Sequence, residues 1–177
     1  AHIKASTDRP GLGIYDPPDN PAQAALLKKA RQSYMGEAIS GEGAARGVFK
    51  HLTQKDRATL YILVDERREL QVWFPTFGRD LMPSGNLSVA LRLARKVGAK
   101  FLPFYLARTD GPYFDLHWHP PLDPQETDDA QIVATLDQFL GRACIDHADQ
   151  WLALHDMDLT QPGHMPPILP ANAPPVM

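Results

Sequence analysis

Apolar residues recur along this chain with two different periods, and these divide it into helices and strands. Apolar positions at helical spacing predict helices at about 43–54, 84–97 and 126–146. A further helix at about 20–35 is predicted by Asn20-Pro21 at its start and Gly36 at its end. Continuous runs of apolar and β-rich residues predict strands at 58–65, 99–108 and 113–119, and 69–74 is a further strand or an extended loop. The turn Thr109-Asp110-Gly111 separates the last two runs, which predicts that they pair antiparallel.

Proline and glycine mark the ends of the folded part of the chain. Residues 1–20 are rich in Pro, Gly, Asp and Asn, which favour turns. In the last seventeen residues, 161–177, six are proline, which predicts an extended tail. Between them, strands alternate with helices. This order predicts an α/β domain over 1–160, with a mostly parallel sheet and helices on both faces.

Composition and charge exclude several classes of protein. The chain has 177 residues with a formal net charge of −3, so it lacks the bulk positive charge of many nucleic-acid-binding proteins. Its single cysteine, Cys144, excludes an internal disulfide and a zinc site built from cysteines. No apolar run approaches the roughly 20 residues that span a bilayer.

Charged residues next to predicted strand and helix ends are the first candidates for a binding site. Asp65 and Glu66 follow a strand, where α/β proteins place functional groups, although a solvated strand end has the same sequence. Arg79 is a candidate for binding an anionic head group, or a surface residue paired with Asp80. The helix start at 83–86 offers backbone N–H groups to an anion, or is simply capped by Ser84 or Asn86.

Two histidines, His117 and His119, are two positions apart on a predicted strand, so both side chains lie on one face. With a third ligand, this spacing binds zinc, and a metal-dependent hydrolase is one hypothesis for the protein. The alternative is a structural role in a segment that also contains Trp118 and Pro120. Cys144 lies on the inner face of the last helix, which indicates a core residue, not a nucleophile.

The order of these segments resembles the bacterial lipid A biosynthesis acyltransferases, a family of the lysophospholipid acyltransferase superfamily. The resemblance covers about residues 12–159. "YDPPDNP" is similar to the family's "YRP..NP" turn, and Asp65-Glu66-Arg67 to its "DQD" strand end. The remaining similar pieces are "TFG" to its "FFG", "PSGN" to its small-residue loop, "LARKVGA" to its "LA...GA" helix, and "ADQWLALHD" to its "PEQWlWlHRR" close.

The resemblance implies a glycerolipid acyltransferase-like fold and an acyl transfer. A lipid hydroxyl attacks an acyl thioester carried by acyl carrier protein or coenzyme A, without a cofactor, in the cytoplasm or at the cytoplasmic face of the inner membrane. On this basis the residues expected to bind substrate are Tyr15, Asp16, Asp65, Glu66, Phe77, Gly78, Arg79, Ser84 and Gly85. We expect those near Asp65, Arg79 and Gly85 to gather at one end of the sheet, with the Tyr15 turn at its border.

The sequence departs from the family's pattern at functional positions. The family's base is the His of an H-x4-D/E motif before the Tyr turn, where a carboxylate orients the imidazole. Here only fourteen residues precede Tyr15, and His2 and Asp8 have the wrong spacing. The family's anion-binding Arg after this Tyr is Asp16, and its closing "HRR" is His155-Asp156-Met157. The catalytic block is therefore expected to be missing from this chain.

Two alternatives follow from these departures. In the first, the chain is the C-terminal portion of a lipid acyltransferase and is inactive alone. In the second, it is a non-catalytic binding or assembly partner with the same fold. Because the family's sheet begins with strands that would precede this sequence, the strand at 58–65 is expected to lack a neighbour, which favours self-association or pairing with an N-terminal segment.

Overall fold

A computed structural model describes residues 11–15, 17–35, 37–40, 44–54, 58–68 and 71–156, without the side chains of 32–35 and 68. The Pro-rich tail and Asp16 lie outside these residues. The chain forms two compact units, Ala1–Ile62 and Leu63–Met177. Among the helices described, none combines the length and apolar character needed to cross a bilayer.

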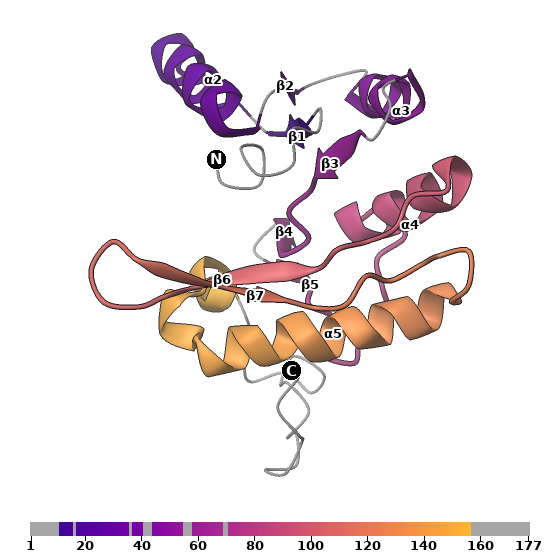
Figure 1. Cartoon of the computed structure of the whole chain (residues 1–177). Coiled ribbons are helices and arrows are strands. Elements are labelled where there is room, and N and C mark those ends of the chain that lie inside the picture. The colour runs from indigo at the N-terminus through magenta and orange to yellow at the C-terminus, as the bar shows by residue number, and fades with distance from the viewer. Residues whose placement is uncertain are drawn as a thin grey trace. The chain divides into compact units, whose positions relative to one another are not determined.

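The first unit contains a parallel sheet of three strands in the order β2-β1-β3 (Figure 1). The sheet is built from β1 (Gly11–Ile14), β2 (Glu37–Ile39) and β3 (Thr59–Tyr61), and the helices α2 (Pro21–Met35) and α3 (Ala44–Gln54) connect them. The side chain of Asn20 accepts hydrogen bonds from the backbone N–H groups of Ala22 and Gln23, which fixes the start of α2. Both helices were predicted, α2 from the residues at its ends and α3 from its apolar positions.

The strand observed at Thr59–Tyr61 is shorter than the apolar run at 58–65 that predicted it. Only Thr59–Tyr61 pair, because β1 is short and provides just three paired positions. The chain then leaves the sheet, and Leu63 is 70% exposed. Among the strands of the described residues, β3 lies at the edge of its sheet, paired with β1.

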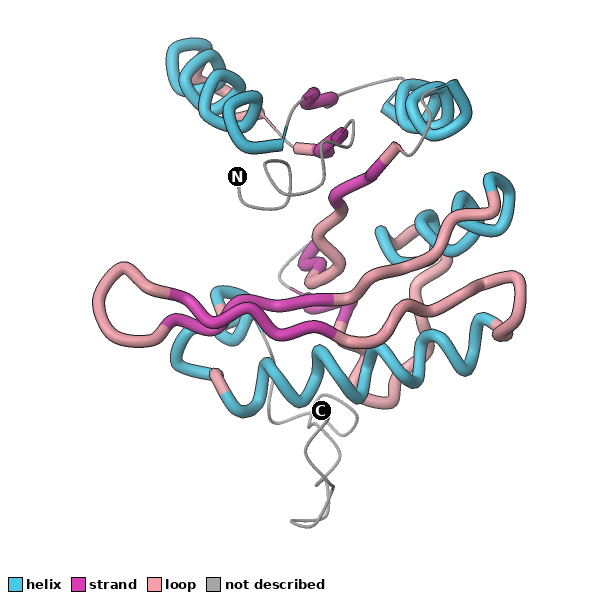
Figure 2. The backbone as a smooth tube through the Cα atoms, viewed as in Figure 1, coloured by secondary structure: helices cyan, strands magenta, loops and turns pink. Residues whose placement is uncertain are grey.

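The second unit packs two antiparallel strand pairs with two helices. The strand pairs are β4 (Glu66–Arg68) with β5 (Gln71–Phe74), and β6 (Phe104–Arg108) with β7 (Phe114–Trp118). The helices are α4 (Asn86–Val97) and α5 (Asp129–Asp146), and short 3₁₀ turns follow at η1 (Ala148–Gln150) and η2 (Leu152–Asp156). Figure 2 shows the β6–β7 hairpin running along α5. The core of the unit consists of Phe74, Leu87, Leu91, Ile132 and Leu136.

The class of fold is mixed α and β, as the alternation of elements predicted. The single larger sheet expected from the sequence is not what the described residues form, since they divide into one parallel sheet of three strands and two antiparallel pairs. The difference arises where the chain reverses in tight connections. β4 and β5 are separated by two residues and β6 and β7 by five, and such short connections join antiparallel strands.

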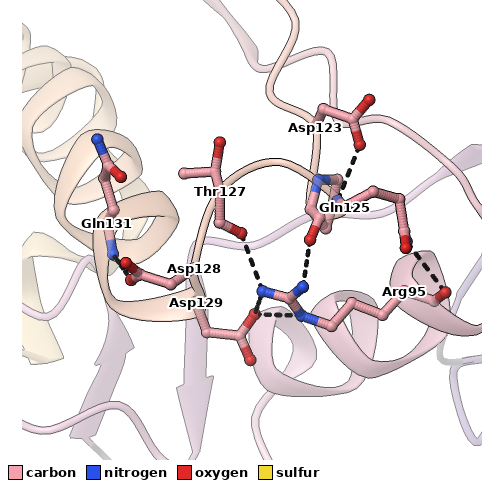
Figure 3. Close-up of polar contacts among 8 residues, drawn as sticks. Arg95, Asp123, Gln125, Thr127, Asp128, Asp129 and Gln131 are labelled. Carbon is pink, nitrogen blue, oxygen red and sulfur yellow. Dashed lines mark hydrogen bonds and ion pairs between the residues drawn. The ribbon is translucent and has the colours of Figure 1, made fainter.

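Arg95 holds the end of α4 to the start of α5 (Figure 3). Its guanidinium binds the carboxylate of Asp129 and the backbone carbonyls of Pro124 and Thr127. The α5 helix is capped by Asp128, whose carboxylate accepts the Gln131 N–H at 2.8 Å. Arg95 therefore has a structural role, and its position at the end of α4 also suits the negative end of the helix dipole.

Candidate functional site

Glu66 closes the N-terminus of α4. Glu66 is 7% exposed, and its Oε2 accepts a hydrogen bond from the backbone N–H of Asn86 at 2.5 Å. Gly85 allows this approach, because a Cβ at that position would lie 3.2 Å from the same oxygen. A carboxylate at a helix N-terminus is stabilised by the helix dipole and by a donor that has no partner within the helix. The expected side-chain cap from Ser84 or Asn86 is not made, since Gly85 is the N-cap residue and Glu66 supplies the acceptor.

The turn at 76–78 wraps around a second carboxylate, that of Asp137 on α5. Asp137 accepts four hydrogen bonds, from the backbone N–H groups of Thr76 (2.6 Å), Phe77 (3.2 Å) and Gly78 (3.1 Å) and from the Thr76 hydroxyl (2.5 Å). Phe77 and Gly78 both have positive φ, at 50° and 85°, which turns successive N–H groups toward one point. Such a concave set of donors binds an anion, and here the anion belongs to the protein.

Arg79 binds carbonyl oxygens of its own loop. Its Nε donates to Thr76 O at 2.7 Å, and its Nη2 donates to Val72 O at 2.8 Å and to Pro75 O at 3.2 Å. Partial burial lowers the pKa of Arg79, and the charge of Asp137 opposes this shift. Two of the three guanidinium nitrogens are thus committed to the loop. A role for Arg79 in binding an anionic substrate stays a prediction.

Asp65 and Cys144 lie in the same electrostatic neighbourhood. Burial raises the pKa of the Cys144 thiol to about 12, and the charges of Asp65 and Asp137 contribute to this shift. Although much of Asp65 is exposed, the protein around its carboxyl removes enough water to raise its pKa, against a hydrogen bond to its own backbone that lowers it. Asp65 and Arg79 are thus linked electrostatically to Cys144 and Asp137 of α5, and Glu66 begins β4 directly after Asp65.

Tyr15 belongs to the first unit and is half-buried at the end of β1. Its backbone N–H donates to Ile39 O at 3.1 Å, and the guanidinium of Arg31 lies 5.4 Å from the centre of its ring. Its expected neighbour Asp16 lies outside the described residues. That Tyr15 borders the site around Asp65 stays a prediction.

His117 and His119 do share one face, as their spacing predicted. His117 stacks on Tyr105 at 4.6 Å between ring centres, and His119 lies edge-on to Phe139 at 5.3 Å. Tyr105 and Phe139 are themselves in contact. Within the described ranges, no group of three His, Cys, Asp or Glu side chains is arranged to hold a metal ion. The two histidines are thus part of an aromatic cluster between the hairpin and α5.

Comparison with known protein families identifies the family of this chain. The sequence model of the bacterial lipid A biosynthesis acyltransferases matches residues 4–157. The chain belongs to this family. The matched range agrees with the resemblance, which covers about residues 12–159. No curated protein matches the chain significantly.

The family's H-x4-D spacing does occur once in this sequence, at His51 and Asp56, after the Tyr turn. A search limited to the residues before Tyr15 misses it. His51 is 4% exposed in α3, and its Nδ1 lies 3.8 Å from a carboxylate oxygen of Glu37. Asp56 lies outside the described residues. Glu37 begins β2, and β3 starts shortly after α3, so His51 lies at the amino-terminal edge of the parallel sheet. Ligands bind at the opposite edge of such sheets.

The acidic replacement in the closing motif has a partner within the fold. Asp156 takes the place of the first Arg in the family's "HRR", and Arg67 takes the place of the last Asp in its "DQD". The structure joins these two positions, because Arg67 Nη1 lies 2.6 Å from Asp156 Oδ2. Nη1 is also 3.1 Å from His155 Nε2. In this chain the two positions that depart from the family's motifs form an ion pair with each other, which gives Asp156 a structural role.

This ion pair is expected to contribute to stability. The Asp156 side chain is only 4% exposed, while that of Arg67 is 47% exposed. Arg67→Ala leaves the buried carboxylate with only the His155 ring nitrogen, 3.2 Å from its other oxygen, and is expected to cost about 2 kcal/mol of unfolding free energy. A double-mutant cycle of Arg67→Ala and Asp156→Ala, followed by urea unfolding, measures the coupling.

The exposed pair Arg142–Asp146 on α5, with an N–O distance of 2.7 Å, provides the matched control. Its coupling is expected to be about 0.5 kcal/mol or less, because both side chains are solvated. Equal coupling energies in the two cycles would show that the buried position of Asp156 has no energetic consequence.

Proposed function

We propose that this protein takes part in transferring an acyl chain from a thioester, on acyl carrier protein or coenzyme A, to a hydroxyl of a lipid. The family match over residues 4–157 is the observation that carries this proposal. The acceptor is lipid A or a lysophospholipid-type lipid, and the transfer takes place at the cytoplasmic face of a bacterial inner membrane.

The two internal carboxylates limit how such substrates are held. Glu66 already occupies the first backbone donor of α4, and Asp137 occupies the donors of the 76–78 turn. A phosphate at either place would have to displace a carboxylate of the protein. In the proposed function, these segments shape the substrate site, and charged groups of the substrate are bound elsewhere.

We further propose that residues 1–177 alone do not catalyse acyl transfer. The base expected before the Tyr turn is not in this sequence, and His51 is buried at the wrong edge of its sheet. The loss of a general base costs roughly 10²–10⁴ in rate. With labelled acyl-CoA or acyl carrier protein and a lipid acceptor, the purified chain should give no product above the protein-free blank.

His51→Gln supplies the control for this assay. If the chain does transfer acyl groups and His51→Gln abolishes the transfer, the motif at 51–56 is catalytic and the proposal of an inactive chain is wrong. Transfer that survives the substitution would also contradict it and would direct the search to another base.

A second candidate function is that of a non-catalytic partner that binds the donor or assembles with another chain. The occupied donors at Asn86 and at 76–78 favour it, because they are anion-binding geometries already filled by the protein. The edge position of β3 is where another strand would add. The transfer assay separates this candidate from the enzyme. Calorimetry with acyl-CoA and light scattering of the chain then show whether it binds the donor or assembles, and a monomer without donor affinity would contradict both forms of the candidate.

A further inference from the structure

The β6–β7 hairpin has two faces of different character. The register pairs Phe104 with Trp118, Leu106 with Leu116, and Arg108 with Phe114, so these six side chains lie on one face. We call this the hairpin face. On the other face, Tyr105 contacts Phe139 of α5, and Ala107 is 4% exposed. The hairpin thus packs on α5 with one side only.

The hairpin face is apolar and exposed. Leu106 is 57% exposed, Phe114 48%, Trp118 41% and Phe104 38%. The rings of Phe104 and Trp118 touch, with 5.4 Å between their centres. The register places the pairs Leu106–Leu116 and Arg108–Phe114 next to them along the same face, so the exposed residues form one surface. Large contiguous apolar surfaces on soluble proteins mark sites of interaction with proteins or membranes.

The charged residues of strands β6 and β7 lie on opposite faces of the hairpin. Arg108 is the one charged residue among the six, and its guanidinium lies 4.6 Å from the centre of the Phe114 ring. Its Nη1 donates to Gly111 O at 3.2 Å, which holds the cation at the end of the strands. Asp115 pairs with Ala107 and therefore lies on the α5 side. The hairpin face presents a cation and aromatic rings without an acidic strand residue.

We propose that the hairpin face lies on the surface of an anionic lipid bilayer. Phenylalanine and leucine side chains enter the acyl region of a bilayer, tryptophan prefers its interface, and arginine pairs with lipid phosphate. The separation of Arg108 from Asp115 is complementary to a negatively charged surface. The inference draws support from the proposed lipid substrate, but it concerns attachment and not catalysis.

The geometry disfavours strand addition by a second copy at this place. The backbone N–H and carbonyl of Arg108 are both bonded by the Gln150 side chain, at 2.7 Å and 3.2 Å. These bonds occupy the outer edge of β6 at Arg108, so a further strand does not pair at that end without displacing Gln150.

Flotation with vesicles tests the proposal. The chain should float with phosphatidylcholine vesicles that contain phosphatidylglycerol, and less with phosphatidylcholine alone. Leu106→Glu should reduce the bound fraction about tenfold, because it places a carboxylate in the apolar surface. Arg108→Gln should remove most of the preference for anionic vesicles. Leu26→Glu, at a leucine of α2 that is 71% exposed, is the matched control and should bind as the parent chain does.

Tryptophan fluorescence gives a second readout that needs no charged variant. Brominated lipids should quench part of the emission of the parent chain, and Trp118→Phe should remove that quenched part. Absence of flotation and quenching would overturn the proposal. So would a dimer that Leu106→Glu dissociates without any vesicle binding, since the face would then be an interface between copies. Acyl-CoA binding in the absence of vesicles tests the proposed function separately.

Discussion

Cys144 is expected to react with iodoacetamide at pH 8 about 1000-fold more slowly in the folded chain than in the unfolded chain. The thiolate is the reactive form, and the pKa of the thiol is raised from 9.0 to about 12. Three pKa units lower the thiolate fraction about 1000-fold at a pH below both values. Mass spectrometry of the alkylated protein, with and without guanidinium, measures the two rates.

A charge variant separates the causes of this shift. Burial is the largest, and the negative charges of Asp65 and Asp137 add to it. Asp65→Asn removes one negative charge beside the thiol, so the pKa of Cys144 should fall and the folded-state rate should rise. Asp149→Asn, at an exposed acid on η1, should leave the rate unchanged. If both variants react like the parent chain, Asp65 does not lie in the neighbourhood that the structure gives it.

Much of the fold was predictable because its signals are local. The apolar stripe of α5 and the Gly98 stop of α4, with φ 67°, are set by neighbouring residues. The antiparallel hairpin was predicted from its turn, and its register confirms it. The run at 58–65 failed as a single strand, because the length of a strand depends on its partner. β1 pairs with β3 at three positions, and the apolar run alone gives no information on the length of its partner.

The roles of the candidate residues were less predictable, because they depend on distant partners. Glu66 was recognised as a strand-end acid, but its use as the cap of α4 requires a residue twenty positions away. The sequence alone indicates that Asp156 replaces a cation of the family and leaves that charge lost. Its partner Arg67 is 89 residues away, so their ion pair can be seen only in the structure. His51 and Asp56 could have been found by applying the H-x4-D pattern to the whole sequence. That His51 is buried, and that it lies at the amino-terminal edge of the sheet, can be seen only in the structure.

Asp137 had no signal in the sequence at all, since a polar residue between apolar positions of a helix reads as part of the solvated face. Asp137→Ala is nevertheless expected to be the most destabilising of the substitutions considered, at about 3–4 kcal/mol of unfolding free energy. It removes the acceptor of four hydrogen bonds. The backbone N–H groups of Thr76 and Phe77 lose this acceptor, and the N–H of Gly78 keeps only the Thr76 hydroxyl at 3.2 Å. Thr76 is 2% exposed, so water cannot easily replace the carboxylate there. Urea unfolding followed by far-UV circular dichroism measures the loss.

Two further variants show whether this loss belongs to the turn. Alanine has the higher helix propensity, so the change within α5 alone would stabilise slightly, and a loss must come from tertiary contacts. Asp137→Asn keeps one carbonyl acceptor but removes the charge, and should cost about half as much. Gln138→Ala changes the adjacent, exposed position of α5 and should cost little. Because Arg79 is held by carbonyls of the same loop, the collapse of the turn in Asp137→Ala should also release its guanidinium. A stability of Asp137→Ala equal to that of Gln138→Ala would mean that the turn holds its shape without the carboxylate, and that its N–H groups are free to bind an anionic substrate after all.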